Sequence, residues 1–240
     1  LIQSLQNEYR TIAMDHIGCG LSDKPQSYPY TLSQHVDNLI QLMDHLQLPD
    51  VHLVVHDWGG PIGLTMAGQL PDRIKSLTIL NTGAFPPISI PWRIFVLRFP
   101  LLGTLAIRGL NLFARSATWM TMHRTKLSAA SRAGLLAPYR SWADRIAVDG
   151  FVKDIPFTKK HPVYAELEQT ENGLSVLASK PVQLIWGMKD WCFTPKCLRK
   201  FQQHFPAADT LEIADAGHYV LEDAAEQVIT RVQQFLDDLS

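Results

Sequence analysis

Apolar runs alternate with amphipathic segments in the first third of the chain and again near its end. The β-branched run at residues 51–55 leads to Asp57 and then to two glycines, a pattern that predicts a buried strand followed by a sharp turn. Residues 62–70 predict a helix with Pro61 near its first turn. Strand, turn and helix in this order predict a nucleophile elbow, in which a catalytic side chain stands on a strained turn at the top of a sheet.

Further segments continue the alternation of strands and helices. Thr31 and Gln34 form a capping-box pattern in front of an amphipathic helix. Strands joined by helices favour right-handed crossovers and a mostly parallel, doubly wound sheet with its active site at the carboxyl ends of the strands. Strands are predicted over residues 9–15, 76–81, 181–190 and 209–214, and helices over residues 1–6, 32–46 and from Asp223 onward.

Four polar residues near these elements are expected to have structural or solvent-facing positions. Asp15 and Ser22 lie in a turn-rich stretch and are expected to organise its loop. His35 and His45 fall on or beside the polar face of the helix at residues 32–46, so we expect water to surround both side chains.

From residue 85 to about residue 173 the strand pattern stops, and helical segments rich in aromatic residues follow. An insertion of this kind at the top of a sheet predicts a lid over an apolar pocket, although most of its aromatic residues are expected to form the lid's own core. We therefore divide the chain into a first part of the core at 1–84, a helical lid at 85–173 and a second part of the core at 174–240.

The lid carries an unusual run of charge. Between Pro91 and Arg132 every charged residue is basic, and no Asp or Glu occurs. Solvated helix faces, an acidic partner and an anionic membrane surface all explain such a run. The residues concerned are Arg93, Arg98, Arg108, Arg115, Arg124, Lys126 and Arg132.

Composition narrows the class of protein. A chain of 240 residues with 46% hydrophobic content suffices for one core and an insertion, and a net charge of −1 gives no bias toward nucleic acid. Cys19, Cys192 and Cys197 form no Cys-x-x-Cys pair, which favours a reducing, cytoplasmic setting and indicates neither a metal site nor a cofactor. No run reaches the ~20 apolar residues of a membrane-spanning helix.

Three residues suggest a catalytic set for nucleophilic chemistry. Asp57, Asp190 and His218 each follow a predicted strand, in the chain order nucleophile, acid, base. A carboxylate is already ionised at neutral pH and displaces a leaving group from an alkyl carbon, whereas its attack on an acyl carbon gives an anhydride. The expected intermediate is an alkyl ester of Asp57, formed from a halide, an epoxide or a lactone. The alternative is that Asp57 only caps the helix that follows it.

Several motifs resemble those of the α/β-hydrolase superfamily and, within it, the haloalkane-dehalogenase-like group. They are DHIGCGLSDKP at 15–25, VHDWGGPIG at 55–63 and DAGHY at 215–219. The lid segments APYRSWA at 137–143 and FVKDIP at 151–156 most resemble the third dehalogenase subfamily, which includes the β-lactone decarboxylases of bacterial long-chain olefin biosynthesis. The resemblance covers essentially the whole chain and implies the α/β-hydrolase fold.

The resemblance also implies a role for each site residue. Asp57 would be the nucleophile, His218 the base that activates water, and Asp190 the acid that orients His218. Trp58 would donate its indole N–H to the departing halide or oxygen. The family's His-Gly-Asn-Pro loop has no match in this sequence, so we expect this loop and an internal strand to precede Leu1.

Three functions remain open on the sequence. A hydrolase or lyase acting on a haloalkane or a β-lactone is the first, because fold and nucleophile do not separate these substrates. Epoxide hydrolase is the second, since it uses a similar Asp-His-Asp set and Tyr139 and Tyr164 are available as acids. The third is a non-catalytic homologue that binds a small apolar ligand in the same pocket. The sequence leaves the oligomeric state open.

Overall fold

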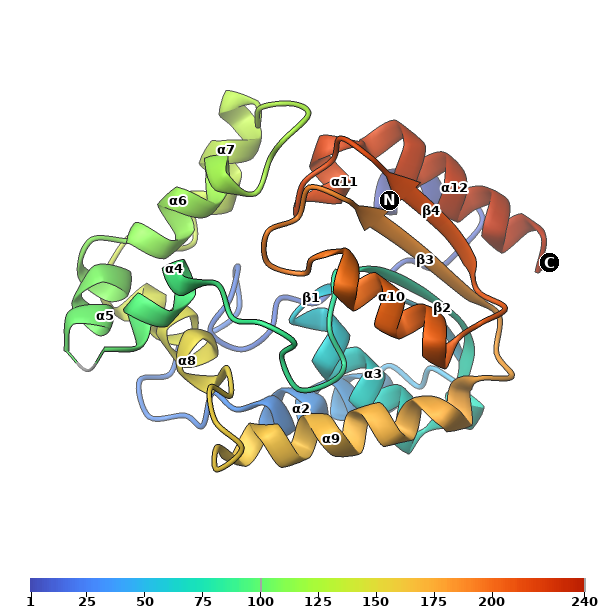
Figure 1. The fold of residues 1–240 in the computed structure, drawn as a ribbon, viewed down its shortest axis with the longest axis horizontal. Coiled ribbons are helices and arrows are strands. Elements are labelled where there is room, and N and C mark those ends of the chain that lie inside the picture. Colours follow the sequence, from blue (N-terminus) through green and yellow to red (C-terminus); the bar gives the residue numbers. More distant parts are fainter. Residues whose placement is uncertain (100, 240) are drawn as a thin grey trace.

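The computed structural model describes residues 1–99 and 101–239, and its centre is a parallel sheet. The strands follow one another across the sheet in chain order, and each neighbouring pair is parallel (Figure 1). All carboxyl ends of the strands therefore lie at one edge, where parallel α/β sheets place their ligands. The strands are β1 (Val51–Asp57), β2 (Ile74–Thr82), β3 (Val182–Gly187) and β4 (Asp209–Ile213).

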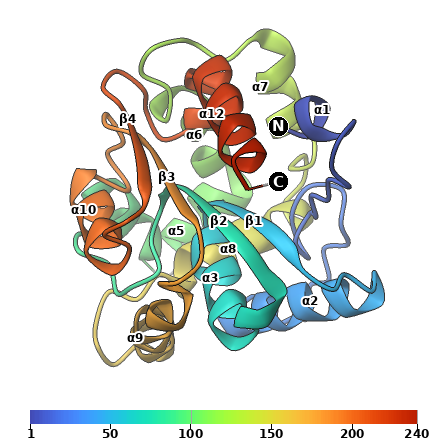
Figure 2. The ribbon, with the colours of Figure 1, turned by 90° about the vertical axis from the view of Figure 1, so that its right-hand side faces the viewer.

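Helices cover both faces of the sheet (Figure 2). Strand residues alternate between two cores, so that Ile79 and Leu184 pack on one side while Leu80 and Ile185 pack on the other. The first core is closed by α2 (Leu32–His45), α3 (Gly59–Gln69), α9 (Pro162–Gly173) and α10 (Pro195–His204), and the second by α1 (Ile2–Leu5), α11 (Val220–Asp223) and α12 (Ala225–Asp237).

The remaining helices lie beside the sheet, on the left of Figure 1. Between residues 85 and 173 the described part of the chain contains helices and turns but no strand. The division into core and lid parts stays a prediction. The helices here are α4 (Trp92–Phe95), α5 (Leu102–Thr104), α6 (Leu112–Met120), α7 (Ala129–Leu136) and α8 (Ile146–Asp154). Single turns complete the list: η1 (Pro71–Arg73), η2 (Val96–Arg98), the π turn η3 (Leu105–Gly109), η4 (Ala143–Arg145) and η5 (Leu174–Leu177).

The capping pattern before α2 forms in part. Thr31 Oγ1 accepts a hydrogen bond from the Gln34 N–H at 3.4 Å, as the sequence predicts. The Gln34 side chain instead turns to Asn38 Oδ1 at 3.2 Å, so only half of the capping box is made.

The strand predicted over residues 9–15 is wrong, because the structure has no strand there. A strand needs a neighbour that takes up its N–H and C=O groups. Within the described residues the sheet ends at β1, which pairs with β2 alone, and no strand lies beside residues 9–15. The apolar alternation of this segment is therefore not sufficient to make it a strand.

The prediction that His35 is solvated is also wrong. Its side chain is fully buried and stacks on Phe151 of α8, with ring centroids 4.6 Å apart. Burial, with the nearby His16, lowers the pKa of His35 to about 4, so its ring is neutral. His45 is exposed, as predicted.

Asp15 and Ser22 organise their loop, as the sequence predicts. Asp15 Oδ2 accepts a hydrogen bond from the Leu21 N–H at 2.8 Å, and Ser22 Oγ donates to the Asp15 main-chain oxygen at 2.6 Å. Among the described helices, none combines the length and the apolar character that spanning a bilayer requires.

Candidate active site

Asp57 stands on a strained turn between β1 and α3. Its φ of +50° lies in the left-handed region, which non-glycine residues adopt uncommonly. Thr82 at the end of β2 donates its hydroxyl to the Asp57 main-chain oxygen. Gly60 allows α3 this close to β2, because a Cβ at Gly60 would lie 1.8 Å from Thr82 Oγ1. Thr82 of β2 therefore contacts the predicted elbow at two points, the main chain of Asp57 and the start of α3 at Gly60.

The three residues of the predicted set meet at the carboxyl edge of the sheet. His218 follows β4, and its Nε2 lies 2.8 Å from Asp57 Oδ2. The other ring nitrogen, Nδ1, lies 2.8 Å from Oδ2 of Asp190, which follows β3. His218 and Asp190 are buried, whereas the Asp57 side chain is partly exposed toward a cavity.

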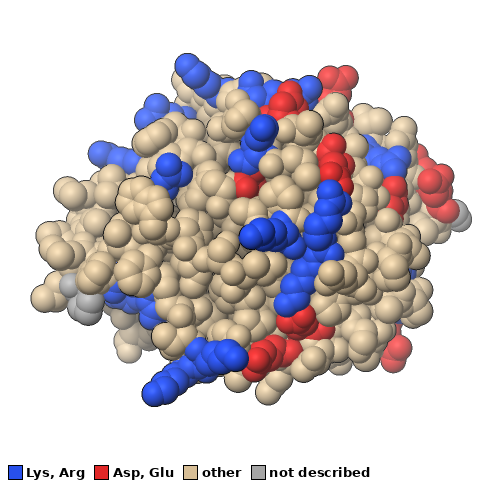
Figure 3. All heavy atoms as spheres, in the orientation of Figure 1, with Lys and Arg blue, Asp and Glu red and all other residues tan. Residues whose placement is uncertain are grey.

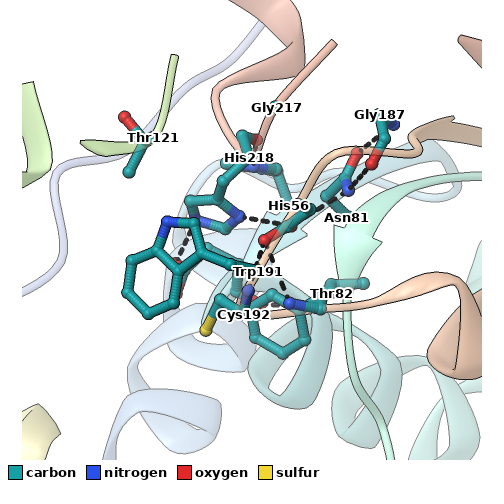
Figure 4. A network of polar contacts seen from close by, with 12 residues as sticks. His56, Asn81, Thr82, Thr121, Gly187, Trp191, Cys192, Gly217 and His218 are labelled. Carbon is teal, nitrogen blue, oxygen red and sulfur yellow. Dashed lines mark hydrogen bonds and ion pairs between the residues drawn. The ribbon is translucent and has the colours of Figure 1, made fainter. Parts of the chain in front are cut away.

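Asp190 is fixed by backbone and side-chain donors. Its Oδ1 accepts from the N–H groups of Cys192 at 2.6 Å and Phe193 at 3.1 Å. Asn81 Nδ2 donates to Asp190 Oδ2 at 3.0 Å, and Asn81 also bonds both main-chain groups of Gly187 (Figure 4). Sequence reasoning missed Asn81; the signal was a polar residue near the carboxyl end of an otherwise apolar strand.

His56, directly before the nucleophile, was also missed. Its Nε2 lies 2.9 Å from the main-chain oxygen of His218, and the two rings lie 4.7 Å apart. Because a carbonyl oxygen only accepts, His56 Nε2 carries the proton. Burial and the charge of His218 lower the pKa of His56 to about 4, so the ring stays neutral and positions the His218 backbone.

The protonation states of the site are coupled. Burial works to lower the pKa of His218, but the charges and hydrogen bonds of Asp190 and Asp57 outweigh it and raise this pKa to about 10. Burial works to raise the pKa of Asp57, but its hydrogen bond to His218 and the nearby histidine charges hold it below its usual value. At neutral pH the site therefore pairs an Asp57 carboxylate with a His218 imidazolium. An ester on Asp57 removes one of the two negative charges, so the proton affinity of His218 then falls.

A cavity of about 410 Å³ opens over Asp57. Its wall is mainly apolar and includes Trp58, Ile94 and Phe151, with the Trp58 and Phe151 rings 5.1 Å apart. Such a pocket fits an apolar molecule whose reacting atom lies at Asp57. Tyr139 also lines the cavity, whereas Tyr164 is not part of its described lining.

Asp223 joins residues 123–125, in the segment predicted to form the lid, to the loop that carries His218. Its carboxylate accepts from the N–H groups of Gly217 at 2.7 Å, His123 at 2.8 Å, Arg124 at 3.1 Å and Thr125 at 2.7 Å. Burial works to raise the pKa of Asp223, but these four donors hold it below its usual value. From the sequence, Asp223 is only the start of the last helix.

No group of three or more His, Cys, Asp or Glu side chains that could hold a metal ion occurs within residues 1–99 and 101–239. The hydrogen bonds of His218 to Asp57 and to Asp190 arrange these three side chains for nucleophilic and proton-transfer chemistry.

Comparison with known proteins gives consistent matches. A family described as "alpha/beta hydrolase fold" matches residues 1–225. The cis-3-alkyl-4-alkyloxetan-2-one decarboxylase of Shewanella oneidensis is 41% identical, over 99% of this chain and 77% of that protein. Haloalkane dehalogenase 2 of Mycobacterium tuberculosis is 28% identical, over 97% of this chain and 80% of that protein. The crystal structure of haloalkane dehalogenase DbeA from Bradyrhizobium elkani shares the fold with a TM-score of 0.85 at 22% identity, over 94% of this chain and 79% of that one.

Proposed function

The chain belongs to the α/β hydrolase family, and from this premise we propose that it is a β-lactone decarboxylase that works through an ester of Asp57. The observation that carries the proposal is the hydrogen-bonded set of Asp57, His218 and Asp190 at the floor of an apolar cavity. The relative with 41% identity bears the name of a decarboxylase of cis-3-alkyl-4-alkyloxetan-2-ones, which supports this substrate class.

In the first step, an Asp57 oxygen attacks the alkyl carbon of the lactone ring that carries the ring oxygen. The bond between this carbon and the ring oxygen breaks, and its electron pair goes to the departing carboxylate. Asp57 enters the step ionised, because its pKa is held below the usual value. His218 Nε2 donates to Asp57 Oδ2 and the Trp58 main-chain N–H donates to Oδ1, so both oxygens of the nucleophile are held in place.

In the second step, the new carboxylate leaves as carbon dioxide. The electron pair of its bond to the adjacent carbon forms the alkene, and the ester bond to Asp57 breaks, which restores the Asp57 carboxylate. No water is consumed. In the lactone reaction the new substrate carboxylate replaces the charge that Asp57 loses, so His218 keeps its proton. The imidazolium then stabilises the returning carboxylate charge, since its Nε2 lies 2.8 Å from Asp57 Oδ2.

Hydrolysis of a carbon–halogen bond is the second candidate, and the cavity wall at Trp58 favours it. The Trp58 side chain lines the cavity directly beside Asp57, where an indole N–H suits a departing halide. In this reaction the ester has to be hydrolysed. His218 loses its proton once Asp57 is neutralised, and it then takes a proton from the attacking water.

The other two functions have less support. Tyr139 borders the cavity, but burial raises the pKa of its hydroxyl, which makes it a weaker acid for an epoxide oxygen. A binding protein without activity has no need for an ion-paired nucleophile, base and acid. A small apolar molecule is the proposed partner of the site.

A reducing compartment, the cytoplasm, stays our proposal for where the protein acts. Among the residues that the structure describes, Cys19, Cys192 and Cys197 form no disulfide, which is consistent with this proposal.

The experiment supplies a cis-3,4-dialkyl β-lactone and, separately, a haloalkane to the enzyme in heavy-oxygen water. We expect alkene and carbon dioxide in equal amounts from the lactone, without heavy oxygen in Asp57. We expect alcohol from the haloalkane, with heavy oxygen entering Asp57 over repeated turnovers. Release of a β-hydroxy acid from the lactone would make the enzyme a lactone hydrolase and overturn the decarboxylase proposal.

Two variants complete this experiment. Asp57→Asn removes the nucleophile and is expected to abolish both reactions. Asp37→Asn changes a carboxylate of α2 that lies outside the cavity lining, and it is expected to leave both rates unchanged. Turnover by Asp57→Asn would contradict the covalent mechanism.

A further inference from the structure

The lid exposes large apolar side chains over a continuous stretch of chain. Their exposure is high, with Trp92 and Leu102 at 70% and Leu101 at 85%. They lie on or between α4, η2, α5, η3 and α6, which pack on one another in chain order on the left of Figure 1. We call this surface the lid patch; its apolar members are Trp92, Phe95, Phe99, Leu101, Leu102, Leu105, Leu110, Leu112 and Trp119.

Arginines stand between these apolar side chains, and the lid patch includes Arg93, Arg98, Arg108 and Arg115. None of the four makes an ion pair with a described residue. Arg98 lies over the Phe157 ring at 4.7 Å and Arg108 over the Trp142 ring at 4.8 Å. The left-hand third of Figure 3 accordingly shows basic side chains on a largely uncharged surface and no acidic ones.

An apolar surface rimmed by one sign of charge marks an interaction site, because a monomer rarely leaves such a patch in water. We propose that the lid patch docks on the surface of an anionic lipid bilayer. Tryptophan and arginine together suit the boundary between headgroups and acyl chains, where indole rings are amphipathic and guanidinium groups pair with phosphates. The helices of the lid patch are short, so they lie in the interface and do not cross the bilayer.

The cavity favours lipid over an acidic protein as the occupant. Ile94 of α4 forms part of the cavity wall together with Ile88 and Ile90, which lie directly before the lid patch, and Ile88 is also exposed. An apolar molecule dissolved in a bilayer would therefore meet the cavity where the lid patch meets the membrane. An acidic protein accounts for the arginines but gives no reason for the cavity to border the same surface.

The test measures cosedimentation of the protein with two kinds of vesicle, phosphatidylcholine alone and phosphatidylcholine mixed with phosphatidylglycerol. We expect binding to the anionic vesicles and little binding to the neutral ones. Added salt should weaken the binding, because exposed charges are screened within ~10 Å at 0.1 M. Binding is measured without turnover, so this proposal and the proposed function fail independently.

Two variants address the two parts of the lid patch. Leu102→Glu places a charge among the apolar side chains, and Arg115→Glu reverses an exposed charge; each is expected to weaken binding by about tenfold. Val176→Glu and Lys196→Glu make the same changes at exposed positions outside the lid patch and should bind like the unaltered protein. None of these residues lines the cavity, so turnover of a water-soluble substrate serves as the folding control.

Three results would overturn the proposal. The first is no binding to anionic vesicles at low salt. The second is binding that Leu102→Glu and Arg115→Glu leave unchanged. The third is a change in oligomeric state in these variants, seen by light scattering without any vesicle binding, which would assign the lid patch to a protein partner.

Discussion

Asn81 Nδ2 lies 3.0 Å from Asp190 Oδ2, the same oxygen that receives the hydrogen bond from His218. Asn81 of β2 thereby fixes the Asp190 carboxylate, whose charge keeps His218 protonated. The charge of Asp190 is the first of the contributions that keep the pKa of His218 high against the effect of burial.

Replacing Asp190 with Asn is therefore expected to lower the pKa of His218 from about 10. Ester hydrolysis should slow by on the order of a hundredfold or more, because the ring loses its orienting charge. Its pH profile should move to lower pH, since less alkaline conditions then suffice to free the base. Asn81→Ala, which keeps the charge, should show a smaller loss; equal pH profiles for all three proteins would contradict this role of Asp190.

His218→Gln separates formation of the ester from its hydrolysis. The first step needs the Asp57 carboxylate, whereas hydrolysis needs a base within reach of water. With a haloalkane, the alkylated protein should accumulate, with a mass gain equal to the alkyl group and with the adduct on Asp57 in peptide maps. Absence of an adduct, or an adduct on another residue, would show that the covalent mechanism is wrong.

Trp58→Phe keeps an aromatic ring on the cavity wall but removes the indole N–H. A hydrogen bond to a charged group is worth about 1.5–3 kcal/mol, so halide affinity and the displacement rate should fall by roughly tenfold to a hundredfold. Trp191→Phe is the matched control, because the Trp191 indole donates to the Met120 main-chain oxygen at 2.9 Å and does not line the cavity. If halide quenches the fluorescence of Trp58→Phe as it does that of the unaltered enzyme, Trp58 is not the donor to the halide.

Tyr139→Phe tests the epoxide alternative. Lactone and haloalkane turnover should stay within about threefold of the unaltered enzyme, because neither reaction needs a phenol as an acid. Tyr164→Phe changes a phenol that is not among the cavity-lining residues, and it serves as the control. Epoxide turnover by the unaltered enzyme that is lost in Tyr139→Phe alone would restore the epoxide hydrolase assignment.

Asp154→Asn is expected to stabilise the fold at neutral pH. Asp154 is buried and accepts from the Leu32 N–H at 2.8 Å, and burial raises its pKa from 3.8 to about 6. The folded protein binds this proton more tightly than the unfolded chain, so the contribution of Asp154 to stability is present below about pH 4 and is lost as the pH rises through 6.

The asparagine side chain is neutral at every pH, so its contribution to stability is not lost as the pH rises. Denaturant unfolding at neutral pH should therefore give a free energy of unfolding about 2 kcal/mol higher for Asp154→Asn, with the difference shrinking toward pH 4. Asp37→Asn, at an exposed carboxylate of α2, is the control. A difference independent of pH would contradict the assignment of this titration to Asp154.

The sequence predicts the elbow and the catalytic set because both depend on local patterns. The run that ends at Asp57 carries its own strand, turn and helix signals, and Asp190 and His218 each follow a strand of their own. Parallel connection of these strands is sufficient to bring the three side chains to one edge.

Features that depend on distant partners could not be predicted in this way. The helical pattern around His35 contains no sign that Phe151 stacks on its ring, and residues 9–15 contain no sign of whether a strand lies beside them. Asn81 and His56 act through hydrogen bonds to residues far along the chain, at Asp190 and at the main chain of His218. These hydrogen bonds form only when folding brings the partner loops together, so the sequence alone does not indicate them.

One carboxylate, that of Asp223, ties the loop of His218 to the lid residues His123, Arg124 and Thr125. The two stretches also touch directly, since a Cβ at Gly217 would lie 2.3 Å from the Thr121 main-chain oxygen. A lid transplanted from a relative must therefore bring backbone donors that match this acid and leave room for that glycine. The predicted lid segment and the loop of the base thus depend on each other for their positions, so substitutions within the existing segment disturb His218 less than its exchange for another.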